Sequence, residues 1–210
     1  MNRDGSSNPG SGPRGIERGR DWGVAAVVPA GLVECRDDQQ AARASGAVFL
    51  TGGDVHRGLG RPLSPTIGDE ATVVAVDRLF CEVTTAAGIL ETPAFSHVLV
   101  GRLSGRSRFV ACVNAGFVGA LNLTPRSHPG DGRFEVLRIE EHMPMRQRMI
   151  ARRKARTGTH VPHPGISISS EIGLVLERQG SEPLVIDGRR IRSWRAARIT
   201  VEPGAVRVYL

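Results

Sequence analysis

Apolar and polar positions alternate in short runs along most of the chain, and turn residues separate these runs. The runs are rich in Val, and Gly, Pro, Asp or Ser bounds them, which is typical of β-strands. Strands are predicted at residues 23–30, 46–50, 72–77, 79–85, 96–103, 108–119, 133–141, 164–170, 172–178, 183–188, 196–202 and 205–210. The pattern as a whole predicts a mainly β domain, barrel-like or a two-sheet β-sandwich, with one or two short helices.

The C-terminal stretch "RITVEPGAVRVYL" has alternating positions on both sides of a Pro-Gly pair. Pro and Gly together are a common turn signal between two strands. The stretch therefore predicts a β-hairpin that turns at Pro203 and Gly204.

Two segments have helical signals. The stretch "DDQQAARASG" predicts a short helix that ends by Gly46, and "MPMRQRMIARRKARTG" predicts a longer one after Pro144. In the second helix Met145, Met149 and Ile150 lie on one side, and the other face carries five arginines and a lysine: Arg146, Arg148, Arg152, Arg153, Lys154 and Arg156. Two interpretations stay open, a solvated basic face above an apolar stripe that packs on the domain, or a basic helix against acidic lipid headgroups.

Composition divides the chain into two parts. Residues 1–21 are mostly Gly, Ser, Pro, Arg and Asn, which predicts a disordered N-terminal arm, and residues 22–210 are expected to form one domain. The three cysteines lie far apart without a CxxC pair, which favours a reducing compartment. No stretch resembles a signal peptide or is apolar for long enough to span a membrane, so a cytoplasmic protein is expected.

The net charge of +7 suits a nucleic acid, an anionic membrane surface or a phosphorylated ligand. Aromatic residues make up only 4% of the chain, so a nucleic-acid-binding β-domain would lack the interleaved aromatic side chains that stack on bases. The nucleic-acid hypothesis therefore rests on charge alone.

Four stretches could carry chemistry. In "TGGDVHRGLG" glycines follow a strand, but the spacing fits no phosphate-binding loop, so the alternative is a glycine turn into a short helix. Asp131 precedes Gly132 at a loop exit, where it could hold a hard cation or simply form a turn. "GTHVPHPGI" offers His160 and His163 without a third metal ligand, and "VIDG" is an Asp-Gly turn between strands.

In this order, the four stretches resemble the C-terminal half of the diacylglycerol kinase and YegS-like lipid kinases, relatives of sphingosine kinases and NAD kinase. The first is similar to the family's TGND(F)AR-x-LG segment, with Gly53 in place of Asn and His56 in place of Ala. "NAGFVGALNLTPRSHPGDGRFEV" is similar to its Asn, glycine cluster and AP-x-A-x-x-x-DG-x-L-x-V pattern. "GTHVPHPGI" and "IDG", followed by "ITVEPGAVRVYL", resemble its G-x-H-xx-HPG, VDGE and PGALRV segments.

The resemblance implies the family's C-terminal β-domain and a set of site residues. Asp131 would bind Mg²⁺, with backbone oxygens near His128 and Arg133 helping. Asp54 would reach the same network through water. Asn114 stands with Asp54 as a cofactor-binding residue.

The chain also departs from the family pattern. The family's GGDGT nucleotide loop is absent, and Arg189 stands where VDGE has the acidic residue proposed as general base. A guanidinium stays protonated at any working pH, so it cannot accept the proton. We therefore expect a lipid-kinase-like protein without kinase activity of its own, which binds a lipid, a small ligand or a partner chain.

The main alternative is a lipid phosphotransferase completed by a separate nucleotide-binding subunit. ATP binding is not expected without such a partner. Peripheral contact with an anionic membrane and assembly into a homo-oligomer are further hypotheses.

Overall fold

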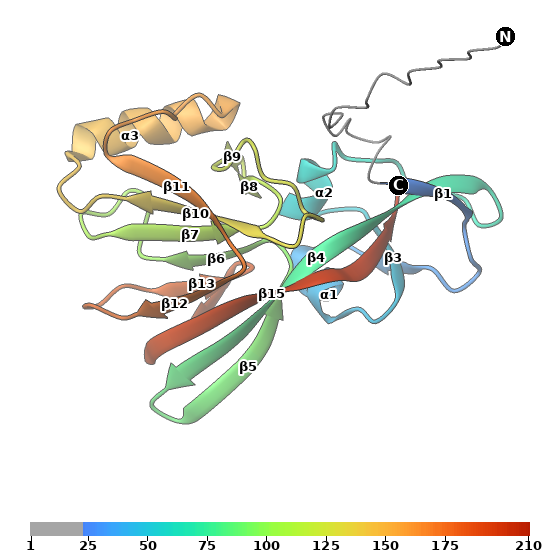
Figure 1. Ribbon diagram of the computed structural model, residues 1–210, viewed down its shortest axis with the longest axis horizontal. Helices are drawn as coiled ribbons and strands as arrows, with labels where there is room; N and C mark the ends of the chain where they lie inside the picture. The colour runs from blue at the N-terminus through green and yellow to red at the C-terminus, as the bar shows by residue number, and fades with distance from the viewer. Residues whose placement is uncertain (1–22) are drawn as a thin grey trace, which may run out of the picture.

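The computed structural model describes residues 23–210, so the predicted N-terminal arm lies outside the described residues. Two β-sheets pack face to face, which confirms the predicted mainly β, sandwich-like fold (Figure 1). The first sheet contains β1 (Gly23–Val27), β4 (Glu70–Thr85), β15 (Trp194–Tyr209), β3 (Ala47–Leu50) and β2 (Val33–Cys35) in that order, with β5 (Gly88–Ala94) on β4 and β12 (Gly173–Glu177) on β15. The second has the order β11 (Ile166–Glu171), β10 (Phe134–Ile139), β7 (Phe109–Val113), β6 (His97–Val100), β13 (Leu184–Ile186) and β14 (Arg189–Ile191). The short pair β8 (Phe117–Val118) and β9 (Leu121–Asn122) stands apart.

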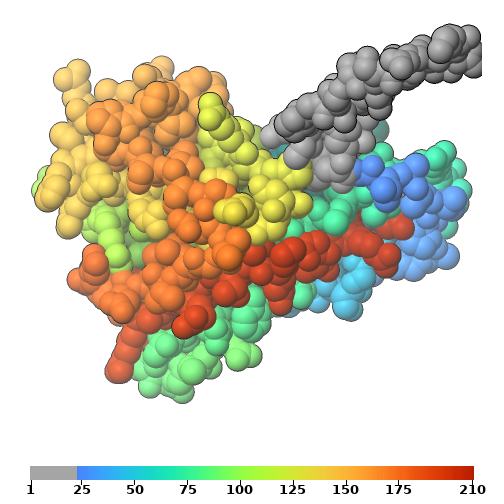
Figure 2. Space-filling model, in the orientation of Figure 1, coloured from blue at the N-terminus to red at the C-terminus, as the bar shows by residue number. Residues whose placement is uncertain are grey.

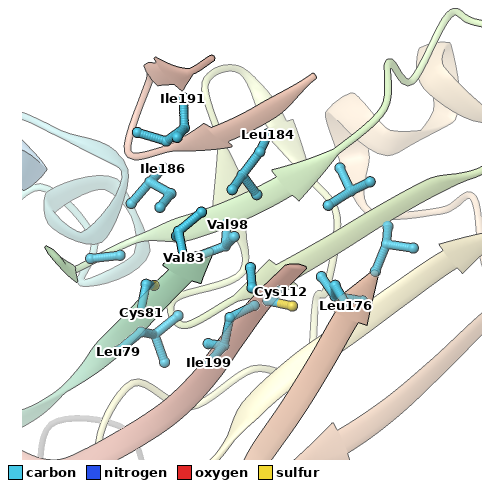
Figure 3. Packing of buried hydrophobic residues seen from close by; sticks show 14 of the residues in the cluster. Leu79, Cys81, Val83, Val98, Cys112, Leu176, Leu184, Ile186, Ile191 and Ile199 are labelled. Atoms are coloured by element: carbon cyan, nitrogen blue, oxygen red, sulfur yellow. The ribbon is translucent and has the colours of Figure 1, made fainter. Parts of the chain in front are cut away.

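The apolar residues of β7 alternate between two faces of the second sheet, and both faces are covered. All five residues of this strand are buried. Val110 and Cys112 belong to the core between the two sheets. Figure 3 shows Cys112 there with Leu79 and Ile199 of the first sheet. Phe109, Ala111 and Val113 alternate with them and pack on the opposite face, beneath a helix.

The strands β4 and β15 are paired antiparallel along nearly their whole length and connect two cores. The halves that contain Leu79 and Ile199 pack against the second sheet. In the other halves, Val74 and Val208 belong to a separate apolar cluster around α1 and α2. The two cores use residues of opposite parity, Leu79 and Cys81 in the one and Val74 and Val76 in the other, and residues of opposite parity lie on opposite faces of a strand. Each strand thus presents one face to the sandwich and the other to the helices.

The predicted hairpin at Pro203 and Gly204 is wrong. The chain continues through this pair as part of β15, and Gly204 takes a φ of +58° that a bulge can accommodate. The carboxylate of Asp77 on β4 accepts the Gly204 N–H at 2.7 Å. A side chain from the neighbouring strand therefore stabilises a bulge where local sequence indicates a turn.

A small parallel unit precedes the long strands. β2, the helix α1 (Asp38–Arg43) and β3 form a βαβ arrangement in which β3 also pairs parallel with β15. The predicted short helix is thereby confirmed. A further short helix, α2 (Asp54–Gly58), follows β3 after the glycine turn, as one interpretation of "TGGDVHRGLG" has it.

The helix α3 (Met145–Lys154), continued by the 3₁₀ turn η1 (Ala155–Thr157), covers the outer face of the second sheet (Figure 1). Its buried residues are Arg148, Ala151 and Ala155. The predicted apolar stripe is therefore wrong, because Met149 and Ile150 are 47% and 48% exposed. The guanidinium of Arg148 donates to five carbonyl oxygens. These hydrogen bonds allow a cation to be buried on the helix face where the sequence pattern predicts an apolar residue.

Within the part of the chain that the structure describes, no helix has the length and apolar character needed to cross a membrane.

Candidate polar centre between the helices and the sheets

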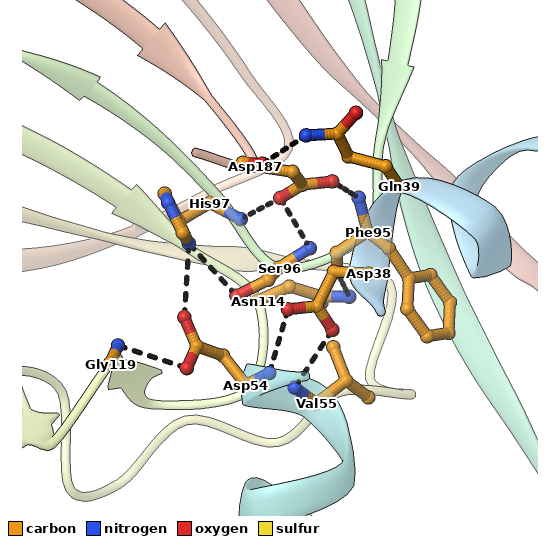
Figure 4. Close-up of polar contacts among 10 residues, drawn as sticks. All are labelled: Asp38, Gln39, Asp54, Val55, Phe95, Ser96, His97, Asn114, Gly119 and Asp187. Carbon is orange, nitrogen blue, oxygen red and sulfur yellow. Dashed lines mark hydrogen bonds and ion pairs between the residues drawn. The ribbon is translucent and has the colours of Figure 1, made fainter. Parts of the chain in front are cut away.

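Asp187 forms the centre of a buried polar network (Figure 4). It lies in the turn between β13 and β14 at a φ of +42°, a conformation that Asp tolerates better than most residues. Its carboxylate accepts three main-chain N–H groups, from Phe95 at 2.6 Å, Ser96 at 3.0 Å and His97 at 2.8 Å. Burial raises the pKa of Asp187 despite these bonds and the nearby His97. All of these contacts hold the segment that leads into β6.

Asp38 occupies the N-terminus of α2. Its two carboxylate oxygens accept the N–H groups of Asp54 at 2.6 Å and Val55 at 3.1 Å. A Cβ on Gly53 would stand only 2.5 Å from the Asp38 carboxylate, so this close approach requires glycine. Burial raises the pKa of Asp38 to about 7, and the charges of Asp187 and Asp54 add to that rise.

Asp54 faces His97. Its Oδ2 lies 3.4 Å from Nδ1 of His97, and its Oδ1 accepts the N–H of Gly119 at 2.9 Å. The same Nδ1 is 3.0 Å from the hydroxyl of Ser96. Burial by itself would raise the pKa of Asp54 and lower that of His97, but their mutual contact reverses both shifts, so Asp54 has a lowered and His97 a raised pKa. The contact joins α2 to β6 and is an ion pair when His97 is protonated.

Asn114 connects this centre to the bulge of β15. Its side-chain amide donates to the carbonyl oxygens of Asp77 at 2.8 Å and Phe95 at 2.9 Å. The Asp77 carboxylate in turn accepts the N–H groups of Gly132 and Gly204, both at 2.7 Å. The structure thus brings Asn114 close to Asp54 and His97 and links it through Asp77 to the loop that contains Asp131.

The predicted magnesium ligands lie on that loop. Asp131 is exposed, and its carboxylate accepts the N–H of Arg133 at 3.0 Å, which is a turn contact. The N–H of Gly130 donates to Nδ1 of His128. Among residues 23–210, no three His, Cys, Asp or Glu side chains gather as metal ligands would. This donor set fits a cation poorly, and the magnesium site stays a prediction.

Among the described residues, no hydrogen bond joins the other candidates to the network. Arg189 is exposed at the start of β14. His160 is buried, with its Nε2 3.0 Å from the carbonyl oxygen of Leu123, and burial lowers its pKa. His163 accepts the N–H of Gly165. The two histidines therefore have separate main-chain partners.

Sequence reasoning missed Asp38, Asp77 and His97 as members of the network. A polar residue inside an apolar run is a signal for Asp77 and His97, because such a residue must find a buried partner. Asp38 offers no comparable signal, since an Asp near a helix start is expected as a cap of its own helix.

No protein-family model and no curated protein matches this chain. Among solved structures, the crystal structure of a diacylglycerol kinase from Bacillus anthracis str. Sterne matches with a TM-score of 0.51 and 11% identity, over 85% of this chain and 75% of that chain. The chain has the diacylglycerol kinase fold. At 11% identity the likeness establishes the fold alone, so the ligand and the activity must be argued from the residues. A yeast NADH kinase complexed with NADH matches with a TM-score of 0.41 and 11% identity, over 85% of this chain and 61% of that one, which is too low to support an argument.

The fold likeness confirms the resemblance drawn from the four sequence stretches at the level of fold. Within the diacylglycerol kinase fold of this chain, those stretches lie at α2, at the Asn114–Asp131 loops, after α3 and at the Asp187 turn. The first, second and last of them meet in the polar network.

Proposed function

We propose that this protein binds acidic lipid surfaces through α3 and does not transfer phosphate by itself. The observation that carries the lipid half of this proposal is the exposed stripe of α3. Arg146, Met149, Ile150 and Arg153 are all exposed and follow the spacing i, i+3, i+4, i+7. Residues at this spacing share one face of a helix.

Charge complementarity supports an acidic lipid surface as the partner. α3 and η1 expose five cationic side chains and contain no acidic residue; the five are Arg146, Arg152, Arg153, Lys154 and Arg156. Each Lys or Arg near an anionic leaflet contributes about 1 kcal/mol. The helix has only two exposed apolar side chains among these cations, so adsorption would be mainly electrostatic, with Met149 and Ile150 reaching the headgroup region. Figure 2 shows this golden segment at the surface of the molecule.

The proposal that the chain does not transfer phosphate by itself rests on the residues at the carboxyl ends of β2 and β3. In parallel α/β units, ligands bind outside these strand ends, and phosphates favour the N-termini of the helices that follow. In this chain Asp37 caps α1 by accepting the N–H of Gln40, and Asp38 caps α2. The carboxyl groups of Asp37 and Asp38 thus take N–H groups that a phosphate would use.

Vesicle co-sedimentation tests the lipid half. Wild type should bind vesicles of phosphatidylcholine with phosphatidylglycerol, bind pure phosphatidylcholine much less, and dissociate at high salt. Arg146→Gln/Arg153→Gln should weaken binding roughly 30-fold, because two charges contribute about 2 kcal/mol.

The matched control is Arg195→Gln/Arg207→Gln, which removes the same charge from two exposed positions on β15. It should bind nearly as wild type does. If both double variants lose affinity equally, net charge and not α3 drives the binding, and the assignment to α3 is wrong.

One observation favours a second candidate function, a phosphotransferase completed by another chain. Within residues 23–210, β2 is an edge strand of the first sheet and pairs only with β3. An open edge next to two parallel strands can accept a further strand from a partner. ATP turnover that appears only when a nucleotide-binding protein is added would support this candidate over the first.

A further inference from the structure

A polar cavity lies away from the Asp187 network. It has a volume of about 590 Å³ and opens between the β6–β7 loop, the loop that precedes β13, and β14. Cavities of this size hold small organic ligands. Its lining includes three arginines, Arg102 and Arg108 from the β6–β7 loop and Arg190 from β14, together with the hydroxyl side chains of Ser107 and Ser181.

The wall of this arginine cavity is fixed by the buried guanidinium of Arg148. Its Nη1 donates to the carbonyl oxygens of Gly105 and Ser107, both at 2.7 Å, and both of these residues line the cavity. The same side chain holds the carbonyl oxygens of Glu140 and Glu141. The β6–β7 loop is thus attached to the segment before α3, and a further cation lies behind the cavity wall.

Arg108 is also fixed. Its Nε donates to Oε1 of Glu182 at 3.3 Å, and its Nη2 donates to the carbonyl oxygen of Glu177. The Glu182 side chain is only 6% exposed, so this pair is largely shielded from solvent. Within residues 23–210, Nη1 of Arg108 has no acceptor, so it is left for a ligand.

Arg102 and Arg190 are exposed, and neither has an ion-pair partner within the described part of the chain. The carboxylates on the lining are Glu182, which is paired with Arg108, and Glu141. With Arg148 behind the wall, positive charge remains in excess around the cavity. A phosphate monoester carries about −1.5 to −2 charge at pH 7 and several strong acceptor oxygens, so it matches the guanidinium groups of Arg102 and Arg190 better than a single carboxylate does.

We infer that the arginine cavity is a binding site for a small phosphate monoester, held by Arg102 and Arg190 and oriented by Arg108. The phosphate group could come from a free phosphorylated metabolite or from the headgroup of a phosphomonoester lipid. This inference does not rest on the proposed lipid-surface function, because it concerns different residues.

Isothermal titration of the full chain tests the site with inorganic phosphate, with dihexanoyl phosphatidic acid and, as a control, with dihexanoyl phosphatidylcholine. Wild type should bind the first two and not the third. Arg102→Gln/Arg190→Gln should bind phosphate at least about tenfold more weakly, because hydrogen bonds to charged groups contribute on that scale. Both arginines are exposed, so the variant should fold normally.

The matched control is Arg195→Gln/Arg207→Gln at two exposed positions of β15, which should bind phosphate as wild type does. Tighter binding of the short-chain phosphatidic acid than of phosphate would identify the lipid headgroup as the source, and equal binding would identify a free phosphate. Absence of phosphate binding, or equal binding by the cavity variant and wild type, would overturn the inference.

Discussion

The Asp187 carboxylate is buried and accepts three main-chain N–H groups, so its removal leaves three buried donors without partners. Each such donor costs roughly 1–3 kcal/mol. We expect Asp187→Ala to lower the free energy of unfolding by about 3 kcal/mol or more. Urea denaturation measures this, with Asp69→Ala at an exposed turn as the control. A loss no greater than in the control would show that the N–H groups find other partners.

The pH dependence of stability follows from His97 and Asp38. The raised pKa of His97 means that its contribution is fully present below its unfolded value of 6.5 and is lost as pH rises through its folded pKa. Asp38 has a folded pKa of about 7. Its ionisation therefore lowers the free energy of unfolding as pH rises from 3.8, and this decrease is complete above about pH 7. Both terms predict lower stability at about pH 8.5 than at about pH 6.

Urea denaturation at the two pH values checks this prediction, and His97→Gln should show a smaller decrease than wild type. The lowered pKa of Asp54 does not interfere, because its contribution is lost only as pH falls through a folded pKa below 3.8. A stability that stays constant or increases toward alkaline pH would contradict the assigned ion pair.

At the scale of elements, α3 depends on a buried guanidinium. Arg148→Met would leave up to five carbonyl oxygens without their donor, and we expect a loss of about 3 kcal/mol or more. Arg146→Met, on the exposed side of the same helix, should change stability by less than about 0.5 kcal/mol. Similar losses in both variants would mean that the carbonyl contacts contribute little.

The elements that the sequence predicts well are those with local signals. Alternating valines and their flanking turn residues predicted the strands of the sandwich core, and the stretch "DDQQAARASG", with Gly46 as its end, predicted α1. The predictions fail where a contact with a residue distant in the sequence determines the local structure. Asp77 turns the Pro203–Gly204 pair into a bulge, and carbonyl groups of a remote loop make Arg148, and not Met149, the buried residue of α3. Local propensity contains no information on such long-range contacts.

At the scale of the whole molecule, sequence motifs predicted the diacylglycerol kinase fold and located Asp54, Asn114 and the Asp187 turn. The sequence did not reveal that Asp38 fills the N-terminus of α2, because the two residues that permit it, Asp38 and Gly53, meet only in the folded chain. The predicted roles of His128, Asp131, Arg133 and Arg189 stay predictions.

The most direct measurement of the central claim is phosphate transfer at a lipid surface. Purified protein is incubated with labelled ATP, Mg²⁺ and vesicles that contain diacylglycerol and phosphatidylglycerol, and label in the lipid fraction is counted. We expect the protein to sediment with the vesicles and the lipid to carry no label above that with an Asp54→Ala/Asp131→Ala control. Labelled lipid that forms with wild type and not with that control would contradict the claim that this chain does not transfer phosphate by itself.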